Sequence, residues 1–295
     1  MITVPELAAE ALGSSLASDM NNRFGATRAD LTHLVSSVAR LALECIGNSD
    51  ALYHNVEHTM LVTLAMNDIL KGRSLLLATS PEDYAHLIIA CLLHDIGYVR
   101  GILAGDTDDE FVIDATGRKT KLARDVSDAA LTAYHVERSK LFALDRLRGV
   151  ELIDADRIAR AIEATRFPSD GNGHVDYEEG LLVRAADLIG YIGDPHYLRK
   201  ANALFCEFQE IGLNRQFGYE TPADLTNLYP QFYYSRVAPH IQIAMRYLNV
   251  TSAGRIWIAS LYSNIFRAER ELGCESKSPL NDRYPRTGSS AMPRS

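Results

Sequence analysis

The sequence predicts an all-α helical bundle with one small inserted β-hairpin. Apolar residues recur at intervals of three and four along most of residues 30–272, the spacing of helices that bury one face. The segment 105–122 departs from this spacing, because Phe111-Val112-Ile113 is followed by a Thr-Gly turn and then by alternating lysines, which is typical of a hairpin.

Helix start and stop signals divide the chain further. Asp30 and Gly47 would begin and end the first helix, Gly72 would end the second, and Ser80 followed by Pro81 would open the third. Residues 218–234 have a looser, aromatic-rich pattern. The expected helices cover 30–47, 55–71, 81–95, 124–147, 154–166, 178–191, 196–211, 236–248 and 253–272.

No linker interrupts residues 30–272, so we expect a single domain over residues 1–275. The remaining segment, 276–295, is rich in Ser, Pro and Arg and is expected to be a disordered tail. The run LIIACLL in the third helix is apolar on all sides, which places that helix in the middle of the protein.

The charge balance excludes some partners. The 295 residues carry 30 Lys plus Arg and 38 Asp plus Glu, a net charge of −8, so the chain lacks the basic footprint of a protein that binds long nucleic acids or anionic membranes. We expect a cytoplasmic protein, because no segment reads as a signal peptide or a membrane span. The four cysteines, Cys45, Cys91, Cys206 and Cys274, form no CxxC pair and are expected to be reduced, the first three as small core residues.

Five residues carry the functional signal. His54 and His58 stand four positions apart, and on a helix both imidazoles would project from one face. His94 and Asp95 end the apolar helix, and Asp187 is an acid inside another apolar helix. A buried carboxylate needs compensation, and imidazoles and carboxylates from facing helices are how helical bundles hold metal ions.

Each residue alone has a simpler interpretation. His94 could be a hydrogen-bonded core histidine, Asp187 could pair with Arg184, and an HxxxH spacing is common by chance. The three features together, in the order H…HD…D, favour a metal site.

This pattern resembles the HD-domain superfamily of metal-dependent phosphohydrolases, through His58, His94-Asp95 and Asp187. Within it, the chain is similar to class I cyclic nucleotide phosphodiesterases. The similarity covers about residues 50–200 and rests on the segments Tyr53-His54-Asn55 with His58, AIEATRF at 161–167, Ala186-Asp187-Leu188 and Asp194-Pro195.

The resemblance implies a phosphodiesterase-like bundle and a role for each residue. His58, His94, Asp95 and Asp187 would ligate a first divalent metal, and Asp95 would reach a second. His54 would be the general acid for the leaving alkoxide, with a ligating His54 as the alternative. Two metals would neutralise the ester and activate water. Imidazole and carboxylate ligands suit Zn²⁺, Mn²⁺ or Fe²⁺, and an oxygen-rich second site suits Mg²⁺ or Mn²⁺.

Other residues fit less closely. Asn55 would orient a water or cap a backbone group. Tyr98 stands where the family has a further His, and His135 is either a second-metal or outer ligand or a surface residue. Arg138 could hold a phosphate. Gln231 and Phe232 offer the chemistry of a nucleobase clamp, with core packing as the alternative.

The favoured function is hydrolysis of a small phosphate ester, most of all a cyclic nucleotide or similar nucleotide. A nucleotide phosphomonoesterase is a close alternative. A diiron HD-type oxygenase that cleaves a C–C or C–P bond would use His135 and His174, but His174 stands in a polar loop and Arg166 occupies the expected position of a helical histidine. A non-catalytic metal sensor is the third alternative, and a homodimer stays open.

Overall fold

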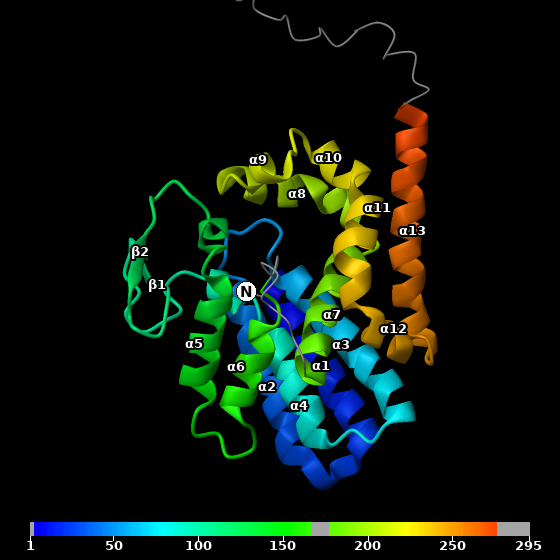
Figure 1. The fold of residues 1–295 in the computed structure, drawn as a ribbon. Coiled ribbons are helices and arrows are strands. Elements are labelled where there is room, and N and C mark those ends of the chain that lie inside the picture. The colour runs from blue at the N-terminus through cyan, green and yellow to red at the C-terminus, as the bar shows by residue number, and fades with distance from the viewer. Residues whose placement is uncertain (1–2, 167–176, 276–295) are drawn as a thin grey trace, which may run out of the picture.

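The computed structural model describes residues 3–166 and 177–275 and confirms an all-α fold with a small inserted β-hairpin (Figure 1). The helices are α1 (Val4–Phe24), α2 (Ala29–Ile46), α3 (Val56–Leu76), α4 (Pro81–Leu93), α5 (His135–Leu147), α6 (Ala155–Glu163), α7 (Glu178–Ile192), α8 (Tyr197–Glu210), α9 (Leu213–Phe217), α10 (Pro222–Asn227), α11 (Tyr229–Phe232), α12 (Gln242–Leu248) and α13 (Ser252–Glu275). The strands are β1 (Glu110–Val112) and β2 (Lys119–Lys121), which pair antiparallel with Phe111 opposite Thr120.

Helix α4 lies at the centre of the bundle, as its apolar sequence predicts. Ser80 caps it, accepting the Asp83 N–H at 3.0 Å, and Pro81 opens its first turn. Every residue from Tyr84 to Leu93 is buried, and α4 packs against α2, α3, α6 and α7. The helix therefore delivers its last residues to a point deep inside the protein.

Two glycines allow helices to approach closely. A Cβ atom on Gly190 of α7 would lie 2.7 Å from the Cα of Val62 on α3, so the two backbones meet at this crossing. A Cβ atom on Gly72 would lie 1.9 Å from the carbonyl oxygen of Tyr247 on α12. Gly72 therefore does not end its helix as expected, because α3 continues to Leu76 and the glycine instead makes room for α12.

Other boundaries differ from those expected. The segment before residue 29, to which the sequence patterns assigned no helix, forms α1, opened by a capping box between Thr3 and Glu6. Helix α2 begins at Ala29, so Asp30 lies in its first turn and is not its cap, whereas Gly47 follows its end. Helix α5 starts only at His135, after a 3₁₀ turn at Asp128–Leu131.

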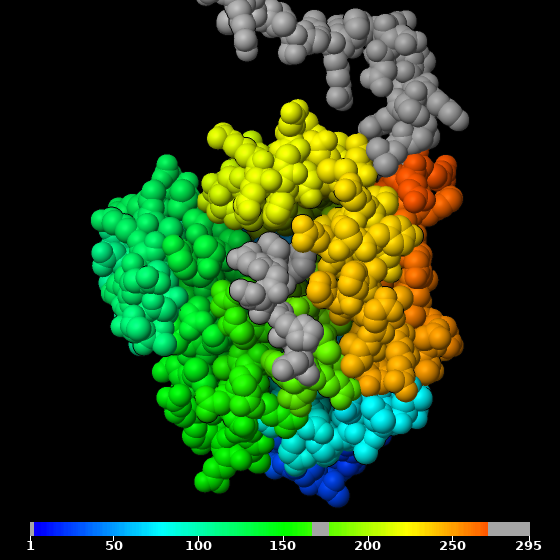
Figure 2. Space-filling model, in the orientation of Figure 1, coloured from blue at the N-terminus to red at the C-terminus, as the bar shows by residue number. Residues whose placement is uncertain are grey.

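Helices α8 to α11 form a cap over one end of the bundle (Figure 1). In the space-filling view the yellow segment of this cap covers the top of the molecule, and the orange segment with α12 and α13 covers its right side (Figure 2). The stretch expected to be loose is largely helical, with α10 and α11 followed by a π-helical turn at Tyr233–Val237.

Three cysteines can be placed. Cys91 is buried and Cys45 half-buried, but Cys206 is exposed on α8, so it is not the core residue expected. All three are free thiols. Across the helices described, none combines the length and the apolar character that crossing a membrane requires. The expected tail at 276–295 lies outside the described residues.

Candidate metal centre and cavity

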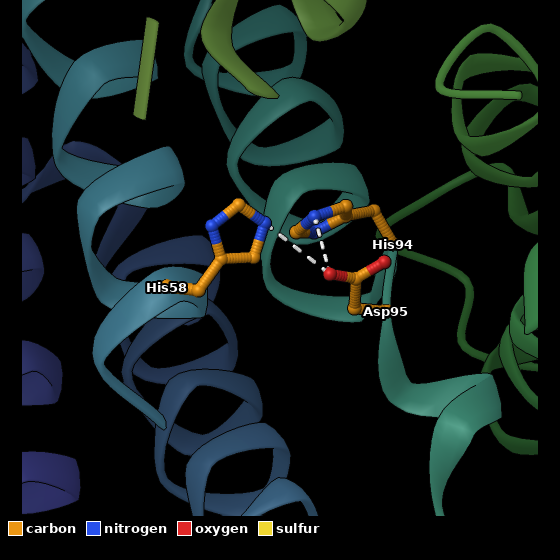
Figure 3. Close-up of side chains that lie close together, drawn as sticks. All are labelled: His58, His94 and Asp95. Atoms are coloured by element: carbon orange, nitrogen blue, oxygen red, sulfur yellow. Dashed lines mark ion pairs between the residues drawn. The ribbon is translucent and has the colours of Figure 1, made fainter. Parts of the chain in front are cut away.

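Three buried side chains converge where α3 meets the end of α4. His58 lies in the first turn of α3, His94 follows the last residue of α4, and Asp95 comes next in the chain. Their side chains point toward one another (Figure 3), and one ligand atom from each lies within 4.8 Å of the others. The Asp95 Oδ2 atom is 3.3 Å from His58 Nε2 and 3.1 Å from His94 Nε2.

Asp187 closes this group from the side of α7. Its Oδ1 atom lies 3.4 Å from His58 Nε2 and 3.5 Å from His94 Nε2. Asp187 therefore pairs with the two histidines, not with Arg184 as the alternative interpretation proposed. Arg184 donates its Nε–H to the Ala164 carbonyl at 2.7 Å. The structure thus brings together the four residues expected to hold a first metal ion.

The spacing of these four side chains fits a divalent cation. Ligands bound tetrahedrally at 2.0–2.1 Å are separated from one another by about 3.3 Å, and cis ligands of an octahedral ion by about 3.0 Å. The observed separations between imidazole nitrogen and carboxylate oxygen run from 3.1 to 3.5 Å. Within the described ranges, His94 Nε2 and Asp95 Oδ2 are buried without a hydrogen-bond partner, which is costly unless a ligand completes them.

The imidazoles and carboxylates of this group shift one another's pKa values in opposite directions. Burial alone would lower the pKa of His94, but the carboxylates of Asp95 and Asp187 outweigh burial and raise it well above its usual value. Burial would raise the pKa of Asp187, yet the imidazoles of His58 and His94 lower it to about 2. A metal ion at this site would therefore compete with the proton on His94.

A second position adjoins the first across Asp95. His135 Nε2 lies 3.6 Å from Asp95 Oδ1, the carboxylate oxygen that faces away from His58 and His94. His135 and His94 are held alike: Nδ1 of His135 lies 2.6 Å from the Thr132 carbonyl, and Nδ1 of His94 lies 2.7 Å from the Cys91 carbonyl. An Nδ1–H donated in this way directs Nε2 toward the cluster, the usual arrangement of ligating histidines. Burial lowers the pKa of His135, which favours its neutral, ligand-competent form.

His54 lies beside the cluster but is held by a different partner. It precedes α3 and is not one helical turn below His58, because Asn55 caps the helix and the chain bends before it. His54 Nδ1 lies 2.6 Å from Glu207 Oε2 of α8. Glu207 is buried, and its Oε1 accepts the backbone N–H groups of Tyr53 and His54 at 2.6 and 3.2 Å. Glu207 therefore fixes both the ring and the loop that carries it.

This contact determines the charge of His54. Burial would lower its pKa, but the carboxylate of Glu207, with help from Asp95 and Asp187, raises the pKa of His54 to about 9. The imidazole is therefore protonated at neutral pH in the metal-free protein. Glu207 has the complementary shift, because its pKa is lowered by His54 despite burial.

Tyr98 separates the two outer histidines. Its ring stacks on His54 with a centroid distance of 4.6 Å and on His135 with one of 4.4 Å, and both stacks are nearly parallel. The three rings therefore form one stack, with Tyr98 between the two histidines. Gly97 permits this arrangement, because a Cβ there would lie 2.0 Å from the His135 carbonyl oxygen.

These residues line one cavity of about 420 Å³, within the size range of sites for small organic ligands. His54, His58, Asp95, His135 and Asp187 form one part of its lining. The cap supplies much of the rest, mainly with apolar and aromatic side chains. Gln231 and Phe232, singled out from the sequence as a possible base clamp, also line this cavity, and so does Thr165 from the AIEATRF segment.

Arg138 lies elsewhere. Its side chain is fully buried and all five of its N–H donors are used. They bind the carbonyls of Gly97, Val99 and Val112 and both carboxylate oxygens of Asp106. Arg138 thus ties the hairpin to the segment after Asp95 and has no donor left for a phosphate.

Asn55 takes the capping role that the sequence left open. Its Oδ1 accepts the backbone N–H groups of Glu57 and His58 at 2.9 and 3.3 Å, and its Nδ2 donates to the Leu52 carbonyl at 2.8 Å. Phe167 and His174, which entered the sequence comparison and the oxygenase alternative, lie outside the described residues.

Sequence reasoning missed Glu207 and the stacking of Tyr98. Glu207 lies on the same helix as exposed Gln209 and Glu210, and its residue type does not distinguish it from them. The only local signal is that Glu207 stands directly between the apolar pair Phe205-Cys206 and Phe208. An acid at such a position is a candidate for burial.

Comparison with known proteins gives a family and nothing on activity. Searches of curated proteins and of solved structures each returned no match. The model of the Npun_R2479-like family matches residues 2–271, almost the whole chain. The chain therefore belongs to the Npun_R2479-like family.

Proposed function

We propose that this chain is a metal-dependent hydrolase of small phosphate esters, and that phosphodiesters are its favoured substrates. The observation that carries the proposal is the position of His54, an imidazole held by Glu207 in the lining of the same cavity as a cation-sized group of two histidines and two carboxylates. An anionic ester needs both a positive centre for its phosphate and a proton for its leaving group, and this wall offers a place for each.

His58, His94, Asp95 and Asp187 would hold the cation, since their spacing fits one and two of the facing atoms, His94 Nε2 and Asp95 Oδ2, are buried without a hydrogen bond. A second cation would lie between Asp95 Oδ1 and His135. When bound, such ions neutralise the phosphate charge and lower the pKa of water into the neutral range.

His54 would protonate the leaving group. An alkoxide is a poor leaving group, and a positioned acid that protonates it accelerates cleavage by about 10²–10⁴-fold. Glu207 supports this role in two ways, because its carboxylate raises the pKa of His54 and because it holds the ring at Nδ1, which leaves Nε2 as the proton donor.

A nucleotide is the substrate class that Gln231 and Phe232 favour. Both line the same cavity as His54, and an amide beside an aromatic ring suits the edge and the face of a base. The same geometry admits a nucleoside monophosphate, so a phosphomonoesterase is the alternative within this proposal.

Elemental analysis and a substrate panel test the proposal together. The purified protein should contain at least one equivalent of Zn, Mn or Fe, and with added Mn²⁺ it should hydrolyse at least one member of a panel of cyclic nucleotides, nucleoside monophosphates and p-nitrophenyl mono- and diesters. Asp95→Asn should lose metal and turnover, whereas Asp145→Asn, at an exposed aspartate, should keep both.

Other results would replace the proposal. Bound iron with oxygen consumption and no ester cleavage would favour the oxygenase. Bound metal without turnover of any ester would favour a sensor.

A further inference from the structure

We propose that the cap contributes a hydrocarbon-binding subsite, so that the preferred ester carries an apolar aliphatic or aromatic group and little charge besides its phosphate. This inference rests on the proposed phosphohydrolase function for its phosphate end. The subsite itself is defined by Phe208, Phe217 and Tyr219, here called the cap cluster.

The cap cluster is a group of three rings in mutual contact. Ring centroids lie 5.9 Å apart for Phe208 and Phe217, 5.8 Å for Phe217 and Tyr219, and 6.5 Å for Phe208 and Tyr219. All three line the same cavity as the metal cluster. The three rings therefore form one aromatic part of the lining of the cavity in which the phosphate would bind.

Two apolar side chains of the cavity lining are exposed to solvent, which is unfavourable for apolar surface. Phe217 is 41% exposed and Leu228, another lining residue, is 38% exposed. Single exposed apolar side chains are common, but here two of them converge on one cavity. An apolar group of a ligand would cover these two side chains, and the burial of apolar surface would favour binding.

The backbone fixes where Phe217 lies. It ends α9, a five-residue helix between Gly212 and Gly218, whose φ angles of +77° and +74° are in the left-handed region that favours glycine. The turns at these two glycines allow α9 to pack beside α8, and this packing places Phe217 next to Phe208.

The small number of cationic side chains in the cavity lining limits how much negative charge the ligand can carry besides its phosphate. Among the described lining residues, Arg236 is the one Lys or Arg. A nucleoside di- or triphosphate would bring several further negative charges with too few cations to meet them. The wall thus suits a group held by burial of apolar surface and not by further ionic contacts.

Direct binding tests the subsite without requiring turnover. Methyl-, butyl- and hexylphosphonate are stable anions that differ only in hydrocarbon length, and their Kd values for the Mn²⁺-loaded protein can be measured by calorimetry. Burial of methylenes should tighten binding by about two- to fourfold each, so hexylphosphonate should bind at least about 30-fold more tightly than methylphosphonate. Alkyl p-nitrophenyl phosphates, which share one leaving group, should show the same trend in kcat/KM.

Variants locate the effect. Phe217→Ala should reduce the hexyl-to-methyl ratio of affinities by about two- to tenfold. Phe266→Ala, at an exposed phenylalanine of α13 outside the cavity, should leave that ratio unchanged. The ratio is taken within each protein, so a general loss of binding or folding cancels.

The outcomes separate the two proposals. Equal Kd values for methyl- and hexylphosphonate, an unchanged ratio in Phe217→Ala, or tighter binding of a nucleoside diphosphate than of hexylphosphonate would overturn the subsite. Ester turnover without a chain-length trend would do the same while leaving the phosphohydrolase in place. A chain-length trend in binding without turnover of any ester would support the subsite and reject the hydrolase.

Discussion

Glu207 and His54 lie 153 residues apart in the chain and form an ion pair at 2.6 Å. One partner belongs to the cap and the other to the loop before α3, so the contact links the cap to the loop beside His58. It also makes the pKa of His54 depend on a residue of the cap.

Replacing the carboxylate should release the proton from His54. In metal-free Glu207→Gln, the pKa of His54 should fall from about 9 to well below that value, because burial then acts without its main opposing charge. Histidine NMR titration measures this directly. Glu210→Gln, on the same helix but bound to Ser127, is the matched control and should leave the His54 titration unchanged.

The same pair should make stability depend on pH. The pKa of His54 in the folded state, about 9, lies above its unfolded value of 6.5, so its stabilisation is complete below pH 6.5 and is lost as pH rises toward 9. The shift corresponds to at most about 3 kcal/mol. Urea unfolding of the metal-free protein should show a gap between wild type and Glu207→Gln at pH 6 that closes by pH 9.5. A constant gap would show that Glu207 acts only through packing.

Loss of the imidazole should affect esters unequally. His54→Ala should retain metal and lose about 10²–10⁴ in kcat/KM on esters with alkoxide leaving groups. The loss should be much smaller on p-nitrophenyl esters, whose leaving group departs without a proton. His33→Ala, at an exposed histidine of α2, is the control. Equal losses on both ester types would remove the acid role from His54.

The buried guanidinium should matter for folding. Arg138→Met leaves the buried Asp106 carboxylate without its charged partner and should destabilise the protein by about 3–5 kcal/mol. Adding Asp106→Asn should recover part of this loss, and Arg148→Met, at an exposed arginine, should cost little. Thermal or urea unfolding would measure all four proteins. A phosphate-binding role would instead predict weak substrate binding with normal stability.

The sequence predicted the parts of this molecule that follow from apolar periodicity. Helix α4 was placed correctly because its cap, its proline and its apolar run agree, and the hairpin was found because its spacing differs from the rest. Helix α1 was missed although Thr3 and Glu6 form a capping box, because apolar residues such as Val4 and Leu7 also lie on its exposed face and mask the buried one.

The candidate site was predictable only where a helix forces a polar group into the interior. His58, His94, Asp95 and Asp187 met that condition, and the structure brings them together. Arg138 is also buried on a helix, but its role was not predictable, because its partners are backbone carbonyls and the distant carboxylate of Asp106. Glu207 depends on how the cap folds over the bundle, a long-range relation that local patterns do not encode.

Gly190 carries no functional group, yet it lies where α7 meets the backbone of α3 at Val62, one turn beyond Asp187 and one turn beyond His58. Any larger residue there would push the two helices apart, and Asp187 would then lie farther from His58. The distance between an acid and a base on two different helices is thus set partly by a residue that has no side chain, and a substitution at this one codon would alter it without changing either group.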